Sequence, residues 1–392
     1  MSHAMQPSEA RSGVRYGCGM LLLTLLAVGS VPGEPLSGQA VLVGHQIDTY
    51  SFRDPDVAGL STISVATTPV TLGLGLGRWA SISARTAYAR GIAEGGDGST
   101  VTLEGLTDTE VIFSLMPFGG DFSLSAVANV PTGRYELSLD EALIGGVVAT
   151  ELLPFPVKSW GSGAALGAEM QILRQLGSWG VAVVGSYRAA QAYDPLDEFI
   201  VGYRPGDQLS ARFALDRDVG DAGSLGAVVG YTEYSGDQSG GLEIFQAGAR
   251  LDAQLSYAFP MGRSHSGLLY GLAYLREPGA PVGTESTSQV QPQPAQQLGM
   301  VGGTLRLSLG RRAAFTPGFE ARVFLAGDEQ SQGWLYAGTG SLELRIAGRP
   351  TGTQLLLVTE GGYRQGNVIV TDGLATGVEG WGVNVMLVVE AR

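Results

Sequence analysis

A long alternation of side chains between Gly299 and Ile346 constrains the fold of this chain more than any other feature. Apolar or small residues occupy every second position of its first segment: Val301, Gly303, Leu305, Leu307 and Leu309. The positions between them are polar or small: Gly302, Thr304, Arg306 and Ser308. Successive residues of a β-strand point to opposite faces of the sheet, so a strand with this pattern has one apolar face and one polar face.

The length of these strands separates a membrane protein from a soluble one. The pattern resumes twice, with Phe319 and Val323 and then with Leu342 and Leu344 on the apolar face. Strands in globular proteins average about 5 to 6 residues. Here each runs for about 10 residues, the length that a tilted strand needs to cross a bilayer. We therefore predict an all-β fold, namely a transmembrane, antiparallel, up-and-down β-barrel that is apolar toward lipid and polar toward its lumen.

Composition and charge agree with this fold class. The chain of 392 residues holds 60 glycines and 44% hydrophobic residues, but only 16% of its residues are charged. Long twisted strands and tight hairpins account for this bias better than a soluble α/β enzyme does. The formal net charge is −13, whereas binding to nucleic acid requires a basic face. We therefore expect no nucleic-acid partner.

The first forty residues have the layout of a secretory signal peptide. Two arginines precede an apolar run at 20–28, and small residues occupy Gly38 and Ala40. A basic region, a short apolar region and small residues before the cleavage point define such a signal. We predict cleavage after Ala40, so that 1–40 is the signal peptide and 41–392 the barrel. The expected location is the outer membrane of a Gram-negative-type bacterium.

The spacing of turns and loops predicts the number of strands. Short turns are expected near Gly77, Gly119, Gly177, Gly220, Gly262, Arg311 and Pro350. Longer connections are expected at 92–106, 131–162, 191–206, 235–246, 277–298, 326–333 and 365–379. Seven hairpins give about 14 strands, and one further strand at each end closes the barrel at about 16. The weak pattern at 41–52 is then the first strand, and the phase change near Pro69 predicts a bulge in the second.

Alternation in the clearer strands also assigns the side chains of the inner wall. Where one set of positions is apolar and faces lipid, the residues between them face the lumen. Twelve charged residues are predicted to line the lumen on this basis: Glu169, Arg188, Arg212, Asp216, Arg250, Asp252, Arg306, Glu320, Arg322, Glu343, Arg345 and Glu360. Positive and negative residues nearly balance, so we expect them to pair across strands, with direct contact to a ligand as the alternative.

The connection at 131–162 is the best candidate for a constriction, because it is the longest and carries apolar residues that are unfavourable when spread in water. The residues proposed for this constriction are Asp140, Glu141, Glu151, Phe155, Lys158 and Trp160. The other long connections are rich in Asp and Glu, so the outer mouth is expected to be acidic. An acidic entrance concentrates cations, which predicts a weak cation preference set at the mouth.

No motif in the sequence indicates catalysis, a cofactor or a metal site. The chain lacks the G-x-S-x-G and H-E-x-x-H motifs and any Cys/His cluster that could hold zinc. An outer-membrane hydrolase is the remaining enzymatic alternative, and His45 is its only plausible base. A histidine in the wall is the simpler interpretation, so we expect no enzyme, no cofactor and no metal.

Three short motifs resemble those of a known family of membrane channels. They are Gly105-Leu106-Thr107-Asp108-Thr109, Asn129-Val130-Pro131-Thr132-Gly133 and Gly161-Ser162-Gly163. Over about residues 60–190 the chain resembles the outer-membrane channels linked to the meta-pathway of phenol degradation and, more loosely, the outer-membrane transporters of long-chain fatty acids. The resemblance implies passive uptake of small solutes, hydrophobic or aromatic ones among them.

The functional expectation is therefore an outer-membrane channel with a loop that folds inward or caps the mouth at 131–162. Its expected partners are outer-membrane lipid and lipopolysaccharide, the barrel-assembly machinery and a small-molecule solute. A structural or adhesive barrel without transport is the alternative, and a hydrolase ranks below both. At about 16 strands a barrel is too wide for wall side chains alone to close it, which favours the channel.

Overall fold

The computed structural model describes residues 39–391 apart from gaps at 118–120, 197–201, 263, 283–291, 328–330, 349–352 and 370–374. Antiparallel strands dominate this part of the chain. They are β1 (Gln39–Phe52), β2 (Leu60–Gly75), β3 (Ala80–Gly95), β4 (Thr100–Leu106), β5 (Thr109–Leu115), β6 (Phe122–Val130), β7 (Ala165–Leu176), β8 (Trp179–Ala190), β10 (Gln208–Asp218), β11 (Ser224–Tyr234), β14 (Arg250–Met261), β15 (His265–Arg276), β17 (Gln296–Ser308), β18 (Ala313–Ala326), β19 (Ser331–Gly348), β20 (Gln354–Ile369) and β21 (Ala375–Ala391).

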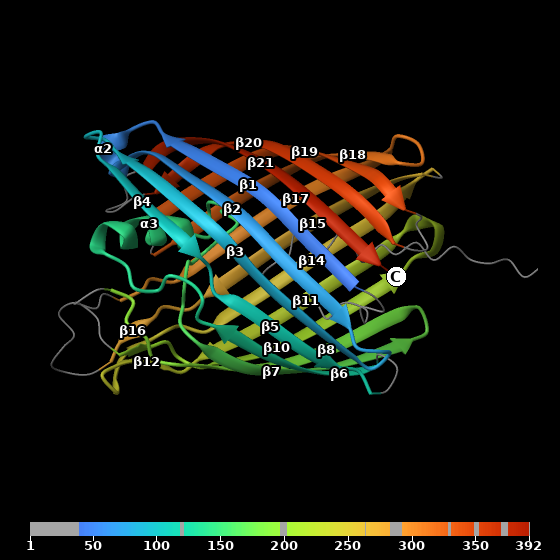
Figure 1. Cartoon of the computed structure of the whole chain (residues 1–392), viewed down its shortest axis with the longest axis horizontal. Helices are drawn as coiled ribbons and strands as arrows, with labels where there is room; N and C mark the ends of the chain where they lie inside the picture. Colours follow the sequence, from blue (N-terminus) through green and yellow to red (C-terminus); the bar gives the residue numbers. More distant parts are fainter. Residues whose placement is uncertain are drawn as a thin grey trace, which may run out of the picture. The chain divides into compact units, whose positions relative to one another are not determined.

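These strands form one closed barrel (Figure 1). Apart from β4, each of these strands pairs with the next one given, and β1 pairs with both β2 and β21, which joins the two edges of the sheet. The sheet contains 17 strands, but β4 and β5 both pair with β3 and form two halves of one position, so the barrel has 16 positions. The prediction of an up-and-down antiparallel barrel of about 16 strands is confirmed, including the doubtful first strand.

Tight glycine turns gather at one end of the barrel, which we call the short-turn end; the opposite end is the loop end. Gly77, Gly177, Gly220, Gly262 and Gly310 all have positive φ angles, from 66° to 102°. Glycine adopts this backbone conformation without a steric cost, so these turns lie where the sequence places them. The expected turns near Gly119 and Pro350 fall outside the described residues.

The predicted long connection at 92–106 is wrong. β3 continues to Gly95 and β4 begins at Thr100, so only a tight turn separates them. The charged and small residues of this segment obscured its strand pattern. The connections predicted at 326–333 and 365–379 are shorter than expected, because β19 begins at Ser331 and β20 continues to Ile369.

The phase change in β2 has a different cause from the predicted bulge at Pro69. The register between β2 and β3 runs without a shift past Pro69, and the only irregularity lies between Leu60 and Thr62. Ile63 and Val65 face the interior and are fully buried, whereas Leu72 and Leu74 face outward. The strand therefore keeps one phase, and the apolar residues change from its inner face to its outer face.

The outer wall carries an exposed apolar belt, as a lipid-facing surface requires. Exposed large hydrophobic residues recur on it in nearly every strand, among them Leu209, Phe213, Leu255, Val301, Phe319, Val383 and Val385. Trp79, Trp179, Trp334 and Trp381 are also exposed. Trp and Tyr are favoured at membrane interfaces because their rings combine apolar and polar parts. The fifth tryptophan, Trp160, is buried.

Short elements decorate the loop end. β9 (Tyr203–Arg204), β12 (Gly236–Ser239), β13 (Leu242–Gln246) and β16 (Ala280–Pro281) form a small second sheet inside connections that the sequence predicted to be loops. Among the described residues, the helices α2 (Pro55–Ala58) and α3 (Leu139–Ala149) also lie at the loop end, whereas the 3-10 turn η1 (Gly220–Ala222) lies at the short-turn end. None of the helices among the described residues is long and apolar enough to span a bilayer.

The N-terminal prediction stays untested, because 1–38 lies outside the described residues. Gln39 and Ala40 already pair with Ala391 and Glu390 of β21. Cleavage after Ala40 would therefore shorten β1 by two residues and leave the rest of its pairing with β21 in place.

Candidate channel lumen and inward loop

The connection between β6 and β7 folds into the barrel instead of projecting from it. Its helix α3 begins with a capping box: the Ser138 hydroxyl accepts from the Glu141 amide, and the Glu141 carboxylate accepts from the Ser138 amide at 3.0 Å. Arg134 also pairs with Glu141. Asp140 lies exposed in the first helical turn, where the helix dipole favours negative charge. We call residues 131–164 the inward loop.

The apolar side chains of the inward loop complete a hydrophobic cluster with the inner wall. The loop contributes Ile144, Val148, Leu152, Leu153, Phe155, Val157 and Trp160, all buried. The wall contributes Tyr50, Ile63, Val65, Ala89, Ala93, Leu103, Leu335, Val368 and Val378. This wall is the inner face of β1 to β4 and β19 to β21 near the loop end. The apolar residues of the loop are thus covered by an apolar arc of the lumen. Burial of these side chains away from water favours docking of the loop.

Two wall glycines make room for the loop. A Cβ added to Gly91 of β3 would lie 3.0 Å from the Trp160 ring and 3.1 Å from Ile144, and one added to Gly333 would lie 2.5 Å from Leu152. The Trp160 indole N–H donates to the Ala89 carbonyl at 3.1 Å, which satisfies its polar atom in the buried site. The inner wall is therefore shaped to receive this loop.

A Gly91→Leu substitution is expected to overpack this contact. It should destabilise the docked inward loop by about 1 to 3 kcal/mol. We expect limited proteolysis of the folded barrel to cut within 136–159 faster than in the wild type. Gly338→Leu is the matched control, because Gly338 faces lipid and has open space around it. Equal cleavage of both variants would show that Gly91 does not support the loop.

The two ends of the inward loop are tied to the wall at one carboxylate. Asp108 accepts hydrogen bonds from the Asn129 side chain at 2.8 Å, from the Gly133 amide at 3.0 Å and from the Ser162 amide at 2.7 Å. Asn129 in turn donates to the Gly163 carbonyl at 2.7 Å. These residues come from the three motifs on which the family resemblance rests. The motifs, distant in sequence, therefore form one hydrogen-bonded cluster at the base of the loop.

The tip of the loop reaches across to another part of the wall. Glu151 lies 3.5 Å from Arg250 of β14, and its carbonyl accepts from Arg322 of β18 at 3.4 Å. Lys158 donates to the carbonyls of Thr150 and Leu153, the latter at 3.1 Å, and so closes the turn after α3. Burial lowers the pKa of the Lys158 ammonium to about 8, although the nearby Glu151 carboxylate opposes this change.

Several of the predicted lumen charges form ion pairs, one of them between strands and two within a strand. Arg306 donates two hydrogen bonds to Glu343, at 2.8 and 3.0 Å, across the intervening strand β18. Arg322 pairs with Glu320, and Arg250 pairs with Asp252 at 2.8 Å.

In two further contacts the partners lie on strands that are two apart, and the strand between them has a glycine at that position. Arg364 of β20 meets Asp48 of β1 at 2.6 Å across Gly382 of β21, and Tyr270 donates to Glu320 at 3.0 Å across Gly302. Asp48 has no exposed surface, so its charge depends on Arg364.

Two arginines on one arc of the inner wall lack ion pairs among the described residues. Arg188 of β8 and Arg212 of β10 face the lumen, and neither has an ion-pair partner in the described part of the chain. Glu169 lies between Ser125 and Ser186 on the same side. This arc lies opposite the part of the wall that the loop covers. These two arginines therefore differ from the arginines of β17 and β18, which form ion pairs.

The remaining predicted residues occupy less central places. Asp216 faces inward near the short-turn end, beside Gly180 of β8. Arg345 donates to the Arg311 carbonyl at 3.1 Å at the same end. Glu360 lies on the inner face of β20, two inward positions before Arg364.

Sequence reasoning missed several inner-wall residues. Asp48 lies in β1, where the alternation is weak. Arg364 shares the phase of Glu360, which was predicted, so the same rule would have found it. Tyr274 and Arg276 lie on β15, whose two faces are both apolar along most of its length, so the phase cannot be read from the pattern.

Neither described histidine lies in a hydrolytic constellation. His45 faces outward on β1, where its Nδ1 lies 3.0 Å from the Thr68 hydroxyl. His265, the first residue of β15, accepts from the Ser308 amide at 3.1 Å. Among the described residues, no group of three His, Cys, Asp or Glu side chains could hold a metal ion.

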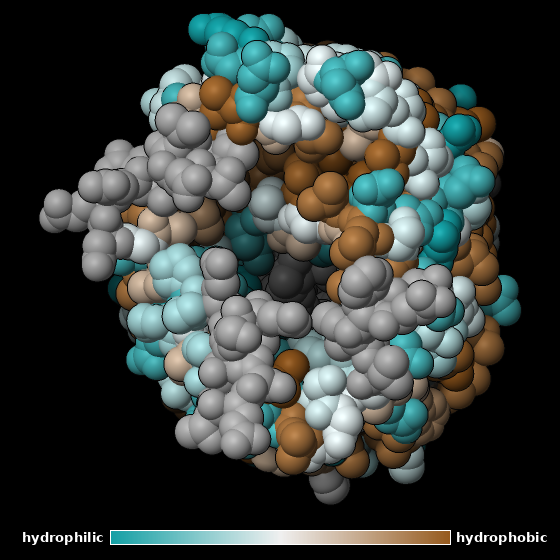
Figure 2. Space-filling view, turned by 90° about the vertical axis from the view of Figure 1, so that its left-hand side faces the viewer, coloured by the Kyte–Doolittle hydropathy of each residue, from teal (hydrophilic) through white to brown (hydrophobic). Residues whose placement is uncertain are grey.

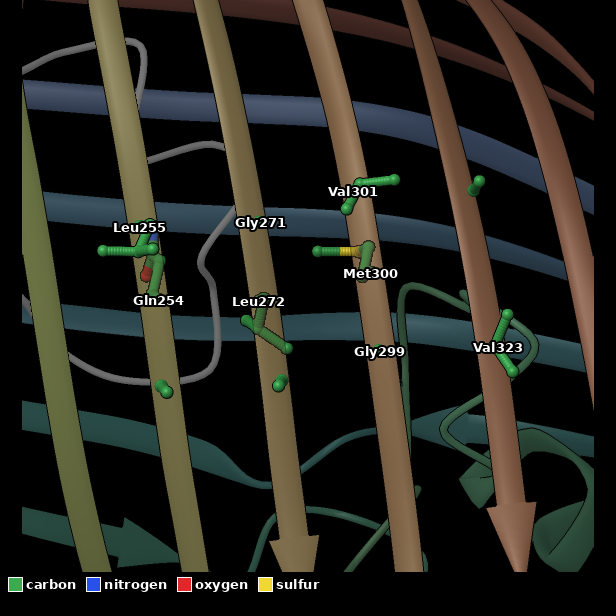
Figure 3. A pocket seen from close by; sticks show the side chains of 11 residues that line it. Gln254, Leu255, Gly271, Leu272, Gly299, Met300, Val301 and Val323 are labelled. Atoms are coloured by element: carbon green, nitrogen blue, oxygen red, sulfur yellow. The ribbon is translucent and has the colours of Figure 1, made fainter.

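Seen from the loop end, the barrel is hollowed at its centre, and both hydrophilic and hydrophobic residues border the hollow (Figure 2). A separate pocket of about 470 Å³ lies on the outer wall over β14, β15, β17 and β18 (Figure 3). Its outward residues are small or apolar, including Ala253, Gly271, Ala273, Gly299 and Val301. This groove faces lipid and is distinct from the lumen.

Comparisons with known proteins give structural likeness only. No family model matches the chain, and no curated protein matches its sequence. A loop-deletion mutant of OmpT, an outer membrane protein of Vibrio cholerae, is 9% identical with a TM-score of 0.43, covering 89% of this chain and 98% of that one.

An outer membrane channel of Pseudomonas putida F1 is 11% identical with a TM-score of 0.36, covering 92% and 98%. A triple mutant of the Rhodopseudomonas blastica porin is 11% identical with a TM-score of 0.40, covering 89% and 99%.

Proposed function

We propose that this protein is a passive channel for small solutes in the outer membrane of a Gram-negative-type bacterium, with the inward loop as its constriction. The observation that carries the proposal is the docked loop. Its apolar residues fill one arc of the lumen, its tip contacts Arg250 on a distant strand, and a mainly polar arc from β6 to β14 is left beside it. A loop tied at both ends and packed on the wall narrows a path without filling a 16-strand barrel.

The chemistry of the remaining wall favours water-soluble solutes. The loop covers much of the apolar inner surface, whereas the inner faces of β6 to β14 carry mainly small, polar or charged residues, among them Ser125, Ser210 and Gln254. The resemblance to channels of phenol degradation still predicts aromatic solutes, and a polar path admits them when they carry a polar or charged group. Lipopolysaccharide and the barrel-assembly machinery remain the partners that this location implies.

Shortening the loop tests the proposal. The base of the loop is pinched, because a Cβ on Gly133 would lie 2.1 Å from the Trp160 carbonyl oxygen. A Gly-Ser-Gly linker can therefore replace 136–159 while the Asp108 cluster stays intact. We expect a conductance increase of roughly twofold or more in planar bilayers and faster swelling of liposomes in larger sugars, because the lumen of about 16 strands is then limited by its wall alone.

A matched deletion separates constriction from general damage. Deleting Gly240 and Gly241 from the turn between β12 and β13 shortens another connection at the loop end and leaves the inward loop unchanged. We expect wild-type conductance from that variant. If neither the wild type nor the loop-shortened barrel conducts, the protein is a structural or adhesive barrel instead.

The pKa of Lys158 predicts how the docked loop responds to pH. Burial disfavours the charged ammonium, so docking favours the neutral form, and the docked state gains stability as pH rises from about 8 toward the ordinary value of 10.5. The gain is at most about 3 kcal/mol. Current fluctuations from loop motion should therefore diminish between pH 8 and 10, and Lys158→Met should remove this dependence. Fluctuations that grow with pH would contradict it.

The hydrolase alternative has a direct assay. Purified barrel is tested for esterase and lipase activity, with His45→Ala as the comparison. We expect no turnover in either, because His45 faces outward and pairs with a threonine. Turnover that His45→Ala abolishes would replace the channel proposal with an enzyme.

A further inference from the structure

Two arginines lie directly opposite each other on the inner wall of the open arc. Arg250 of β14 and Arg276 of β15 are register partners. Like charges directly opposite on neighbouring strands are destabilising. Such a pair is tolerated when another group compensates the charge of the second arginine.

Acidic side chains compensate only one of the two. Arg250 pairs with Asp252 at 2.8 Å and with Glu151 of the inward loop at 3.5 Å. Arg276 has no ion pair in the described part of the chain, and its Nε is buried without a hydrogen-bond partner. The positive charge of Arg276 is therefore left without a counter-charge beside the constriction.

Aromatic rings hold both guanidinium groups in place. Arg250 stacks on Tyr274 with its Cζ 4.3 Å from the ring centre, and Arg276 stacks on Tyr234 at 5.2 Å. A stacked guanidinium keeps its planar edge of N–H donors available for a carboxylate, and the ring reduces the entropy lost on binding. The two arginines are thus pre-oriented.

A second unsatisfied donor lies in the same cluster. Tyr274 is only 2% exposed, and its hydroxyl has no hydrogen-bond partner among the residues that the structure describes. The charged groups whose fields reach this hydroxyl are Glu151, Arg250, Arg276 and Asp252. A buried hydroxyl without a partner costs free energy, which a bound acceptor would recover.

We propose that Arg276, the Tyr274 hydroxyl and Arg250 form a binding site for small organic carboxylates beside the tip of the inward loop. The carboxylate accepts from the edge of the Arg276 guanidinium and from Tyr274, and it competes with the Glu151 carboxylate for Arg250. The proposal deepens the proposed function, on which it rests, by naming the class of solute. Arg188 and Arg212, which make no ion pair in the described part of the chain, lie on the same arc and attract anions toward this site.

The site changes the expected ion preference. The acidic mouth still concentrates cations, but the narrow part of the path carries positive charge without a matching acid on one side. An anion that passes the mouth therefore binds at the constriction. The cation preference predicted from the loops is then a property of the entrance alone.

Benzoate is the probe, and benzyl alcohol is its neutral counterpart with the same ring. Binding to the detergent-folded full barrel is measured by calorimetry, and the effect on current is measured in planar bilayers. We expect benzoate to bind and to reduce the current, whereas benzyl alcohol does neither. Arg276→Gln and Tyr274→Phe should each weaken benzoate binding by roughly tenfold, as the loss of one hydrogen bond to a charged group does.

Arg345→Gln is the matched control, because Arg345 is an inner-wall arginine that bonds to a backbone carbonyl near the other end. It should bind benzoate like the wild type. Arg276→Lys keeps the positive charge but loses the forked N–H donors of the guanidinium. This variant should bind benzoate more weakly than the wild type and more tightly than Arg276→Gln.

Every outcome decides the proposal. No benzoate binding to the wild type, or equal binding by wild type and Arg276→Gln, overturns the site. Benzoate binding that Arg276→Gln weakens, in a barrel that conducts no ions, supports the site and refutes the channel. A conducting barrel without benzoate binding refutes the site and leaves the channel standing.

Discussion

Replacing Asp108 with alanine is expected to release the inward loop from the wall. The carboxylate accepts from Asn129, Gly133 and Ser162, and each such hydrogen bond to a charged group contributes about 1.5 to 3 kcal/mol. Loss of the acceptor also leaves the partly buried amides of Gly133 and Ser162 unsatisfied. A loss of about 3 kcal/mol from the free energy of loop docking shifts the docking equilibrium by roughly a hundredfold. We expect large, unstable conductance levels and rapid proteolysis within 136–159.

Asp237→Ala is the control for this prediction. Asp237 also binds a loop amide, accepting from Gly206 at 2.7 Å, but it belongs to the small second sheet and does not contact the inward loop. It should leave the conductance and the cleavage pattern unchanged. If Asp108→Ala behaves in the same way, the hydrophobic cluster alone holds the loop.

Replacing Arg364 with leucine is expected to have the largest effect on barrel stability. Asp48 is fully buried and meets Arg364 at 2.6 Å, so the variant leaves a buried carboxylate without its counter-charge. Removing one partner of a buried pair costs about 3 to 5 kcal/mol. The midpoint of denaturant unfolding in detergent should fall accordingly.

The double variant separates the pair from its surroundings. Asp48→Leu combined with Arg364→Leu removes both charges and replaces them with apolar volume, which is often neutral. We expect it to recover much of the stability that Arg364→Leu loses. If the double variant is less stable than either single variant, then Glu360 and the other charges near Arg364 set the stability instead of the pair.

The barrel itself was predictable because alternation is a local property of each strand. In β17 to β19 the apolar and polar faces are distinct over long runs, so their orientation, the turns and the strand number followed. The segment at 92–106 was mistaken for a loop because Glu94, Gly95 and Asp97 interrupt the pattern. A single tight turn contains the same residue types as a long loop.

The sequence predicted that this connection folds inward or caps the mouth, but it did not predict the surface on which the loop packs. Apolar residues such as Leu152 and Phe155 signal that a connection must be buried. The matching surface is an apolar arc inside the lumen, which contradicts the rule that inner faces are polar. Ile63 and Val65 therefore appeared as a phase change near Pro69, when they mark the surface that receives the loop.

The charged site was only partly readable. Pairs such as Arg306 with Glu343 join strands that are two apart, so alternation predicts their face and cannot predict the partner. Arg276 lies on a strand with two apolar faces, and the absence of a partner for it depends on its three-dimensional neighbours. Charge balance counted over the whole wall does not show which individual arginines lack an ion pair.

One measurement tests the docked loop most directly. A Cβ on Gly333 lies 2.5 Å from the Leu152 side chain, so cysteines at these two positions should cross-link the loop to β19. The experiment uses a Cys18→Ser background, since Cys18 is the only native cysteine. We predict that the disulfide forms spontaneously on oxidation and leaves the single-channel conductance at the wild-type level, because the loop already occupies this place. Failure to cross-link, or a several-fold fall in conductance on oxidation, would show that the loop normally lies elsewhere and would contradict the account.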